Sequence, residues 1–382
     1  MKFNSRLLVC CGFFAASVIP SGAALAQMSS GTEGQNCSDI QMMRNECGKQ
    51  QNKKQDKQQD KPTSDYPNAT RPEPKIEPID DKEVKALNEG LSATSSGDSA
   101  TAQKDLQPIV DGSKSDYAKA EALRGLAQIR YNSGDTKGAI ALQKQAVDLN
   151  SLPNNDYFPS LYTLAQMYVA DEDYSAALST LDQWMQQSGK PSADAYALQA
   201  NAYYRMEKYP EAVAAVKKAD SMTDQPKSDW DQILMASYFA MDKYDDAAKV
   251  AEAALAKDPN NAKMLMSVIQ IYTNAHEYDK ALPLLERARA NGQITDELNY
   301  VNMAKFYYNM AAQGQDTKAN ALKAAAVVEE GMGKGIIQPN KDNYKLLGDA
   351  YRLAGDETKA NAAYDKGGLP HSAGKQKKHK SN

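Results

Sequence analysis

The chain is poor in the residues on which most enzyme chemistry depends. Its 382 residues include three histidines and four cysteines. No histidine has a cysteine, a serine or a second histidine at a useful spacing, so nucleophilic and metal catalysis lack their usual groups. The G-x-S-x-G and H-E-x-x-H motifs are missing as well. The sequence therefore predicts a protein that is not an enzyme and that uses no cofactor and no metal.

Glycine-rich loops and charge of one sign are also scarce. The only glycine-rich stretch is GMGKG at 331–335, which follows a predicted helix and lacks the spacing of a phosphate-binding loop. We interpret it as a helix end and turn. The formal net charge of −4 gives no reason to expect a nucleic-acid partner. Alternating runs of β-branched residues are absent, so we expect no strands.

The N-terminal segment 1–26 has the organisation of a cleaved signal peptide. Two basic residues precede an apolar run over 7–19, and the A-x-A sequence of 24–26 supplies a cleavage site. The apolar run is too short to remain as a transmembrane helix, and no later stretch is long enough either. We therefore expect an exported, periplasmic protein with no transmembrane segment after signal cleavage.

Signal cleavage leaves two cysteines, Cys37 and Cys47, in a short head over 27–47. An exported cysteine pair favours a disulfide. A continuous helix would hold the two residues about 15 Å apart, which is beyond bridging distance. Either the segment between them bends, or the disulfide joins two molecules. Metal binding is the weaker alternative, because no histidine lies nearby.

Two segments resemble solvated chain. Residues 48–79 are filled first by Lys, Gln and Asp and then punctuated by five prolines, so we expect a disordered spacer in which almost nothing is buried. Residues 369–382 form a C-terminal tail that ends in the basic sequence GKQKKHKSN. Such a tail is usually solvated, and contact with an anionic lipid or polymer is the alternative.

An internal repeat of 34 to 35 residues dominates the segment 80–368. Tyr174 recurs as Tyr209, Tyr244 and Tyr278, with steps of 35, 35 and 34. Each unit predicts two helices that pack closely through small residues, with this tyrosine at the turn between them. Three other columns share the period: Tyr168, Tyr203, Tyr238 and Tyr272; Ala177, Ala212, Ala247 and Ala281; and Trp184, Ala219, Ala254 and Ala288. Trp184 and Trp230 fall at packing columns, so we expect both in the core.

The repeat unit resembles the tetratricopeptide repeat (TPR), which has a 34-residue period and spaced Leu, Gly/Ala, Tyr, Ala, Phe, Ala and Pro columns. The resemblance implies an all-α fold, a right-handed superhelical solenoid of about seven or eight TPR-like helical hairpins, with an extended concave face. It also implies a scaffold for protein–protein interaction. The unit at 341–368 shows the pattern as Tyr344, Leu347, Gly348, Tyr351, Ala360 and Tyr364.

A narrower resemblance concerns the residues 161–209, 229–255 and 329–364. These are similar to periplasmic repeat proteins encoded with TonB–ExbB–ExbD energy-transduction systems. The resemblance implies an accessory role in TonB-dependent outer-membrane transport, with TonB, ExbB, ExbD or an outer-membrane receptor as partner. The spacer and the basic tail are not part of that family's pattern. The alternative is a cell-envelope assembly adaptor that contacts peptidoglycan or outer-membrane machinery.

In resembling repeats, first-helix positions between the packing columns line a groove that holds an extended segment of a protein partner. At these positions tyrosines, arginines and carboxamides dominate, which are suitable residues for a peptide-binding surface, although exposed helix faces are polar in any case. We expect Tyr131, Tyr204, Arg205 and Tyr308 to be the main anchors. The corresponding residues are Arg124, Gln128, Tyr131, Asn132, Tyr162, Gln166, Asn201, Tyr204, Arg205, Gln232, Phe239, Gln270, Asn274, Asn302, Lys305, Tyr308 and Asn309.

Overall fold

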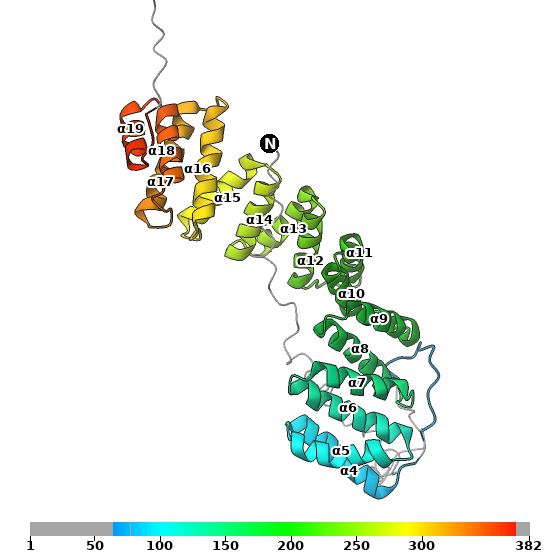
Figure 1. Ribbon diagram of the computed structural model, residues 1–382. Coiled ribbons are helices and arrows are strands. Elements are labelled where there is room, and N and C mark those ends of the chain that lie inside the picture. Colours follow the sequence, from blue (N-terminus) through cyan, green and yellow to red (C-terminus); the bar gives the residue numbers. More distant parts are fainter. Residues whose placement is uncertain (1–63, 77, 372–382) are drawn as a thin grey trace, which may run out of the picture. The chain divides into compact units, whose positions relative to one another are not determined.

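The computed structural model describes residues 64–76 and 78–371, and within these ranges it contains sixteen α-helices and no strand. The helices belong to two compact units, one reaching to Met241 and one beginning at Asp242 (Figure 1). The predicted signal peptide, the head with Cys37 and Cys47 and the basic end of the tail lie outside the described residues. The all-α repeat architecture expected from the sequence is confirmed.

Unit 1 contains four helix pairs, α4/α5 to α10/α11, followed by the single helix α12. Unit 2 begins with the single helix α13 and continues with three pairs, α14/α15 to α18/α19. The helices of unit 1 are α4 (Asp81–Ser96), α5 (Ser99–Gly112), α6 (Asp116–Asn132), α7 (Thr136–Asp148), α8 (Asn154–Ala170), α9 (Tyr174–Ser188), α10 (Ala193–Arg205), α11 (Tyr209–Asp220) and α12 (Ser228–Ala240). Those of unit 2 are α13 (Tyr244–Lys257), α14 (Ala262–Asn274), α15 (Tyr278–Ala290), α16 (Glu297–Ala312), α17 (Thr317–Gly333), α18 (Lys341–Leu353) and α19 (Glu357–Lys366).

The turn inside each pair requires one residue with left-handed backbone. In the α8/α9 turn this is Glu172, at φ 63°, and its amide and that of Asp173 bond back to carbonyls of α8. The Asp173 side chain then caps α9 by accepting from the amide of Ala176. The next residue, Tyr174, begins α9. The prediction of a tyrosine at the turn is therefore confirmed, and the same column begins α11, α13 and α15.

Small residues let the helices of each unit approach closely. The alanine column of Ala177, Ala212, Ala247 and Ala281 is fully buried. In unit 1, a Cβ on Gly125 of α6 would lie 2.6 Å from the Leu106 side chain of α5, so a larger residue there would force Leu106 to shift. The two tryptophans predicted to be in the core are indeed buried, Trp184 at 6% exposed and Trp230 at 5%.

Two irregular stretches in unit 2 follow from the sequence. The extra residues around 312 lengthen α16 and α17 to 16 and 17 residues, whereas α14 and α15 have 13 each. The glycine-rich stretch at 331–335 closes α17, which ends at Gly333, and Gly335 has φ 71°. The interpretation of this stretch as a helix end and turn is confirmed.

Residues 64–76, which we call the strap, lie within the predicted spacer, and Arg71 is their one buried residue. The strap lies against the α8/α9 pair of unit 1, and Figure 1 shows it in blue. The Tyr66 ring lies 4.7 Å from that of Phe158, and Arg71 is only 7% exposed. Composition did not indicate these contacts, because the strap backbone and Arg71 have their partners on residues far along the chain.

Candidate protein-binding face

The residues predicted to bind a partner all lie on the first helices of their pairs. They come from α6, α8, α10 and α12 in unit 1 and from α14 and α16 in unit 2. With the exception of Tyr162, every one is at least partly exposed. We call this set of exposed positions the first-helix face, and we describe it separately for each unit.

In unit 1 the first-helix face carries one carboxamide in each of three successive pairs. Gln128 of α6, Gln166 of α8 and Asn201 of α10 each follow directly after a fully buried alanine, so they occupy the same position of the repeat. A carboxamide both donates and accepts hydrogen bonds, as a peptide backbone does. This carboxamide column therefore matches the bonding needs of an extended chain.

Gln166 is the least satisfied member of the carboxamide column. Its Oε1 is buried and has no hydrogen-bond partner within the described part of the chain. A buried acceptor without a partner costs about 1–3 kcal/mol. Because this oxygen is shielded from the surface, a peptide donor could remove that cost only if the Gln166 side chain turned outward.

Two arginines near the carboxamide column are held by neighbouring elements. Arg124 of α6 pairs with Glu121 at 2.8 Å and with Asp156 of α8 at 3.5 Å. Arg205 of α10 donates to the Tyr174 hydroxyl at 3.2 Å and lies 3.9 Å from the Glu172 carboxylate. Both guanidinium groups are therefore fixed against the preceding or following pair.

Two aromatic positions flank this part of unit 1. On α6, Tyr131 stands three residues after Gln128, and on α10 Tyr204 stands three residues after Asn201, so each shares a helix stripe with its carboxamide. The Tyr204 ring lies 5.8 Å from that of Tyr209. The remaining predicted members in unit 1 are Asn132, which accepts from Gln128 Nε2 at 2.8 Å, together with Gln232 and Phe239 of α12.

Tyr162 does not belong to the first-helix face. It is 9% exposed, and its ring lies 5.4 Å from Trp184. Burial raises the pKa of its hydroxyl, with a smaller effect of Asp194. The prediction was wrong because Trp184 stands in a column that elsewhere holds alanine, and this larger side chain draws Tyr162 into the core.

The first-helix face of unit 2 keeps a carboxamide at this repeat position on α14, where Gln270 stands two residues before Tyr272 as Gln166 does before Tyr168, and it differs on α16. On α16, Asn302, Lys305 and Tyr308 are spaced by three residues, and the adjacent Asn309 is exposed. Lys305 takes the repeat position that the carboxamides hold in unit 1. On α14, Asn274 Nδ2 bonds to the main-chain oxygen of Gln270 at 2.8 Å, which occupies one of its donors.

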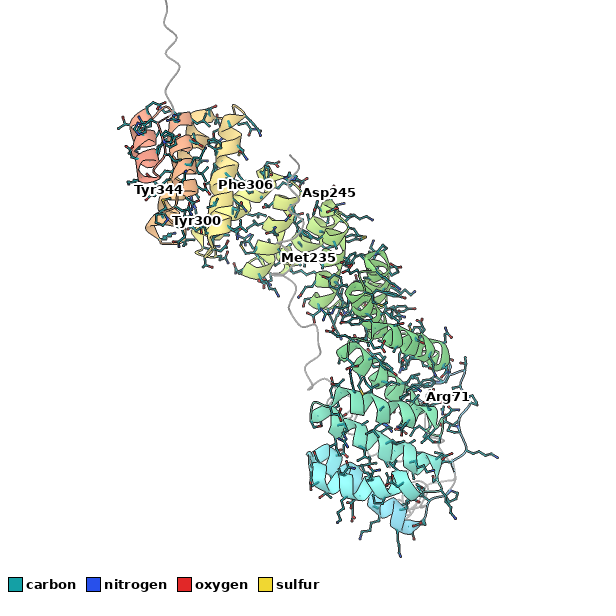
Figure 2. All side chains as sticks on the ribbon, in the orientation of Figure 1. Arg71, Met235, Asp245, Tyr300, Phe306 and Tyr344 are labelled. Atoms are coloured by element: carbon teal, nitrogen blue, oxygen red, sulfur yellow. The ribbon has the colours of Figure 1, made fainter. Side chains whose placement is uncertain are left out.

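The structure also reveals a second polar site, which sequence reasoning missed. Arg71 of the strap donates from Nε to Asn150 Oδ1 at 2.8 Å and from Nη1 to Asn154 Oδ1 at 2.6 Å. Its Nη2 reaches the main-chain oxygens of Asn150 and Leu152, both at 3.0 Å. The guanidinium lies over the Tyr157 ring, 3.9 Å from its centroid. We call these four residues of α8 and its preceding turn the arginine socket, and Figure 2 labels Arg71.

Nothing in the sequence around Arg71 announces this site, since its partners lie 79 to 83 residues further along the chain. The described residues contain no group of His, Cys, Asp or Glu side chains suited to a metal ion. None of the described helices is long and apolar enough to pass through a bilayer.

Comparison with known proteins bears on the repeats. Tetratricopeptide repeat models match residues 87–152, 162–228 and 238–296, which together make up half of the chain. No curated protein matches it.

Solved structures with a similar fold have low sequence identity. A tetratricopeptide repeat protein from Parabacteroides merdae shares 13% identity over 71% of this chain and 99% of its own, with a TM-score of 0.45. MamA from Desulfovibrio magneticus shares 19% identity over 51% of this chain and 98% of its own, with a TM-score of 0.39. YrrB, a TPR protein described as having an unusual peptide-binding site, shares 16% identity over 48% of this chain and 90% of its own. Its TM-score is 0.37.

The three matched ranges run through most of unit 1 and into α15 of unit 2, and each covers successive helix pairs with the small-residue columns described above. Tetratricopeptide repeats are scaffolds for protein interaction and are typically not enzymes. The chain belongs to the tetratricopeptide repeat family.

Proposed function

We propose that the protein is a non-enzymatic scaffold that binds an extended segment of a protein partner on the first-helix face of unit 1. The observation that carries the proposal is the column of Gln128, Gln166 and Asn201, one carboxamide in each of three successive pairs. Gln166 supports it as well, because the residue is partly exposed and turning its side chain outward would offer the unpaired Oε1 to a peptide amide.

The aromatic positions beside this column would supply most of the affinity. Tyr131 and Tyr204 offer large contact areas and lose little side-chain entropy on binding. Interfaces generally depend on a few such anchors. Arg205 would add a fixed positive charge, since its guanidinium is already held by Tyr174 and Glu172.

We further propose that the scaffold works in the periplasm, as an accessory of TonB-dependent transport. The signal-like segment 1–26 supports the compartment, and the resemblance of 161–209, 229–255 and 329–364 to repeat proteins of TonB–ExbB–ExbD systems supports the partner. The partner segment would come from TonB, ExbB, ExbD or an outer-membrane receptor.

The test is photo-crosslinking in cells, with a photo-reactive amino acid in place of Tyr204 on α10. A matched probe in place of Lys218, an exposed residue of α11, serves as control. We expect position 204 to crosslink to a TonB-system component or an outer-membrane receptor, and position 218 to give no such adduct. In the purified protein, Tyr204→Ala should weaken binding of that partner without changing the melting temperature.

Other outcomes would correct the proposal in distinct ways. Adducts only with peptidoglycan-associated or outer-membrane assembly proteins would replace the transport role by that of an envelope adaptor. Adducts at position 218 but not at 204 would show that the partner binds the second helices. Unfolding by Tyr204→Ala would assign this residue to the core.

A further inference from the structure

The arginine socket recognises its ligand by shape and hydrogen bonding, without an opposite charge. All three nitrogens of the Arg71 guanidinium are bonded, and each acceptor is a neutral amide or carbonyl oxygen. No ion pair joins Arg71 to a carboxylate of the described residues. Burial lowers the pKa of its guanidinium, while Tyr157 and Glu73 act in the opposite direction. The flat guanidinium group of arginine can stack on the Tyr157 ring while it donates hydrogen bonds within its own plane. The ammonium group of a lysine could not do both.

The α8/α9 pair also recognises the backbone of the strap. The amide of Thr70 donates to the main-chain oxygen of Gln187 at 2.8 Å. Asn154 Nδ2 donates to the main-chain oxygen of Arg71 at 3.2 Å, and the main-chain amide of Asn154 donates to Glu73 Oε1 at 3.0 Å. The strap is thus bound as a peptide that turns over 66–69, where the Ala69 amide donates to the Tyr66 carbonyl oxygen at 3.1 Å, and that is held by its main chain and by one central side chain.

The passage for this peptide is kept open by glycine. A Cβ on Gly189 would lie 2.3 Å from the main-chain oxygen of Asn68, and Gly189 has φ 62°. Five residues before Arg71, Tyr66 covers the Phe158 ring and lies 5.3 Å from the Lys190 ammonium. The edge of α8/α9 therefore has a channel for the backbone, a socket for arginine and an aromatic contact for tyrosine.

Several features weaken the hold of this site on the strap. Arg71 is the only buried residue of the strap, and the hydrogen bonds of Asp65 and of the Thr70 hydroxyl lie at the exposed surface. The cation is removed from water without a direct ion pair, which opposes docking. Ordering a segment that has no helix or strand opposes it as well. These two costs offset part of the stabilisation that the hydrogen bonds provide.

We propose that the edge of α8/α9 is a second peptide-binding site of this protein, and that the strap is its resident, displaceable ligand. The site takes a protein segment in which a tyrosine precedes an arginine by five positions across a turn, as Tyr66 precedes Arg71. The competing ligand is a segment of this chemistry from another protein. This site is separate from the first-helix face, and its test does not depend on the function proposed above.

The experiment uses the full chain and a fluorescent peptide with the sequence of residues 64–76. In the wild-type chain the resident strap competes, whereas Arg71→Ala releases it. Fluorescence anisotropy should show saturable binding to the Arg71→Ala chain, at least tenfold tighter than to the wild type. A peptide carrying alanine in place of the arginine should bind at least tenfold more weakly. Lys75→Ala, which alters an exposed residue of the strap, is the control and should behave as the wild type.

A second substitution identifies the site, since Asn154→Ala in the Arg71→Ala chain should abolish binding of the peptide. Circular dichroism establishes that each variant is folded. Absence of saturable binding to the Arg71→Ala chain would overturn the proposal, as would equal binding of the two peptides.

Hydrogen exchange of the unmodified chain provides an independent measurement. If the strap undocks, the Thr70 amide should exchange at least a hundredfold faster than the central amides of α8. Equal protection would make the strap a fixed part of the fold and would also overturn the proposal.

Discussion

Unit 1 and unit 2 share the same repeat columns but link successive helix pairs by different polar contacts. In unit 2, the Tyr272 hydroxyl of α14 donates to Glu252 of α13, and the Tyr307 hydroxyl of α16 donates to Glu286 of α15. In unit 1 the position equivalent to Glu252 is Lys217, whose ammonium lies 5.7 Å from the Tyr238 ring. The tyrosine column carries a lysine–ring contact in both units, since Lys280 lies over Tyr272 and Lys323 over Tyr307 in unit 2, and unit 2 adds a hydrogen bond from each of these hydroxyls to a carboxylate of the preceding helix.

This difference distinguishes the contacts that the fold requires from the contacts that vary between repeats. The buried alanine column is present in both units, so the fold requires close helix packing through small residues in each of them. The polar partner of the tyrosine is exchangeable, because the ring fills the same space with either neighbour. Unit 1 has in addition an external tie, the strap, for which no counterpart exists among the described residues of unit 2.

The largest expected effect tests the column that both units share. Ala212→Leu in α11 and Ala281→Leu in α15 each force extra methylenes into a fully buried position. Each should destabilise its unit by about 1–3 kcal/mol or more, and by similar amounts. Hydrogen exchange followed peptide by peptide measures the two units separately. Unchanged protection in either unit would show that its alanine does not lie at a close helix contact.

The next effect tests the polar links. Tyr307→Phe removes the hydroxyl that bonds the Glu286 carboxylate and should cost unit 2 about 1–2 kcal/mol. Tyr203→Phe is the matched change in unit 1, where no hydrogen bond to a side chain holds this hydroxyl in the described structure, and it should cost less than about 0.5 kcal/mol. Denaturant melting of both variants provides the measurement. Equal losses would remove the distinction between the units.

The same links predict a dependence on pH. Burial, and then the Glu286 carboxylate, raises the pKa of Tyr307 above its ordinary value of 10.0, and burial and Glu252 do the same for Tyr272. A tyrosine whose folded pKa is raised stabilises the fold fully below pH 10, and this stability is lost as the pH rises beyond that value.

Thermal melting between pH 8 and pH 11 should therefore show a decline above pH 10. The decline should be shallower in the Tyr272→Phe, Tyr307→Phe double variant. An identical decline in the wild type and the double variant would mean that other tyrosines cause it.

The smallest expected effect concerns the strap. Arg71→Ala should lower the global stability by less than about 1 kcal/mol, because the released strap regains its contact with water. Unit 2 should not respond at all. Thermal melting and hydrogen exchange check both statements. A loss of several kcal/mol would mean that unit 1 needs the strap in order to fold.

Periodicity predicted the repeating part of this molecule in detail. The tyrosine at the start of α9, α11, α13 and α15 and the buried alanines follow from local spacing, which the sequence records directly. Tyr162 shows the limit of that reasoning, because one tryptophan in a column of alanines changed its environment. The sequence predicted the binding positions only as exposed positions on first helices. The repeat pattern does not identify the ligand that binds there.

Arg71 shows a second limit. Its surroundings of Pro, Glu and Lys are those of solvated chain, and an average over composition cannot detect a single residue with partners about 80 positions away. Long-range contacts of isolated residues are invisible to periodicity, since they occur only once.

The course of the strap has a mechanical consequence. Its first described residues are fastened to the third helix pair, where Asp65 bonds Asn155 at 3.0 Å and Lys190 at 3.3 Å. A pull on the chain before Ser64 therefore loads α8 and α9 from the side, and α4 carries no tension while the strap holds. Once the strap peels away, the segment 64–79 can reach an end-to-end length of about 55 Å at roughly 3.4 Å per residue. Under tension the strap would therefore detach and lengthen before the first helix pair is stretched.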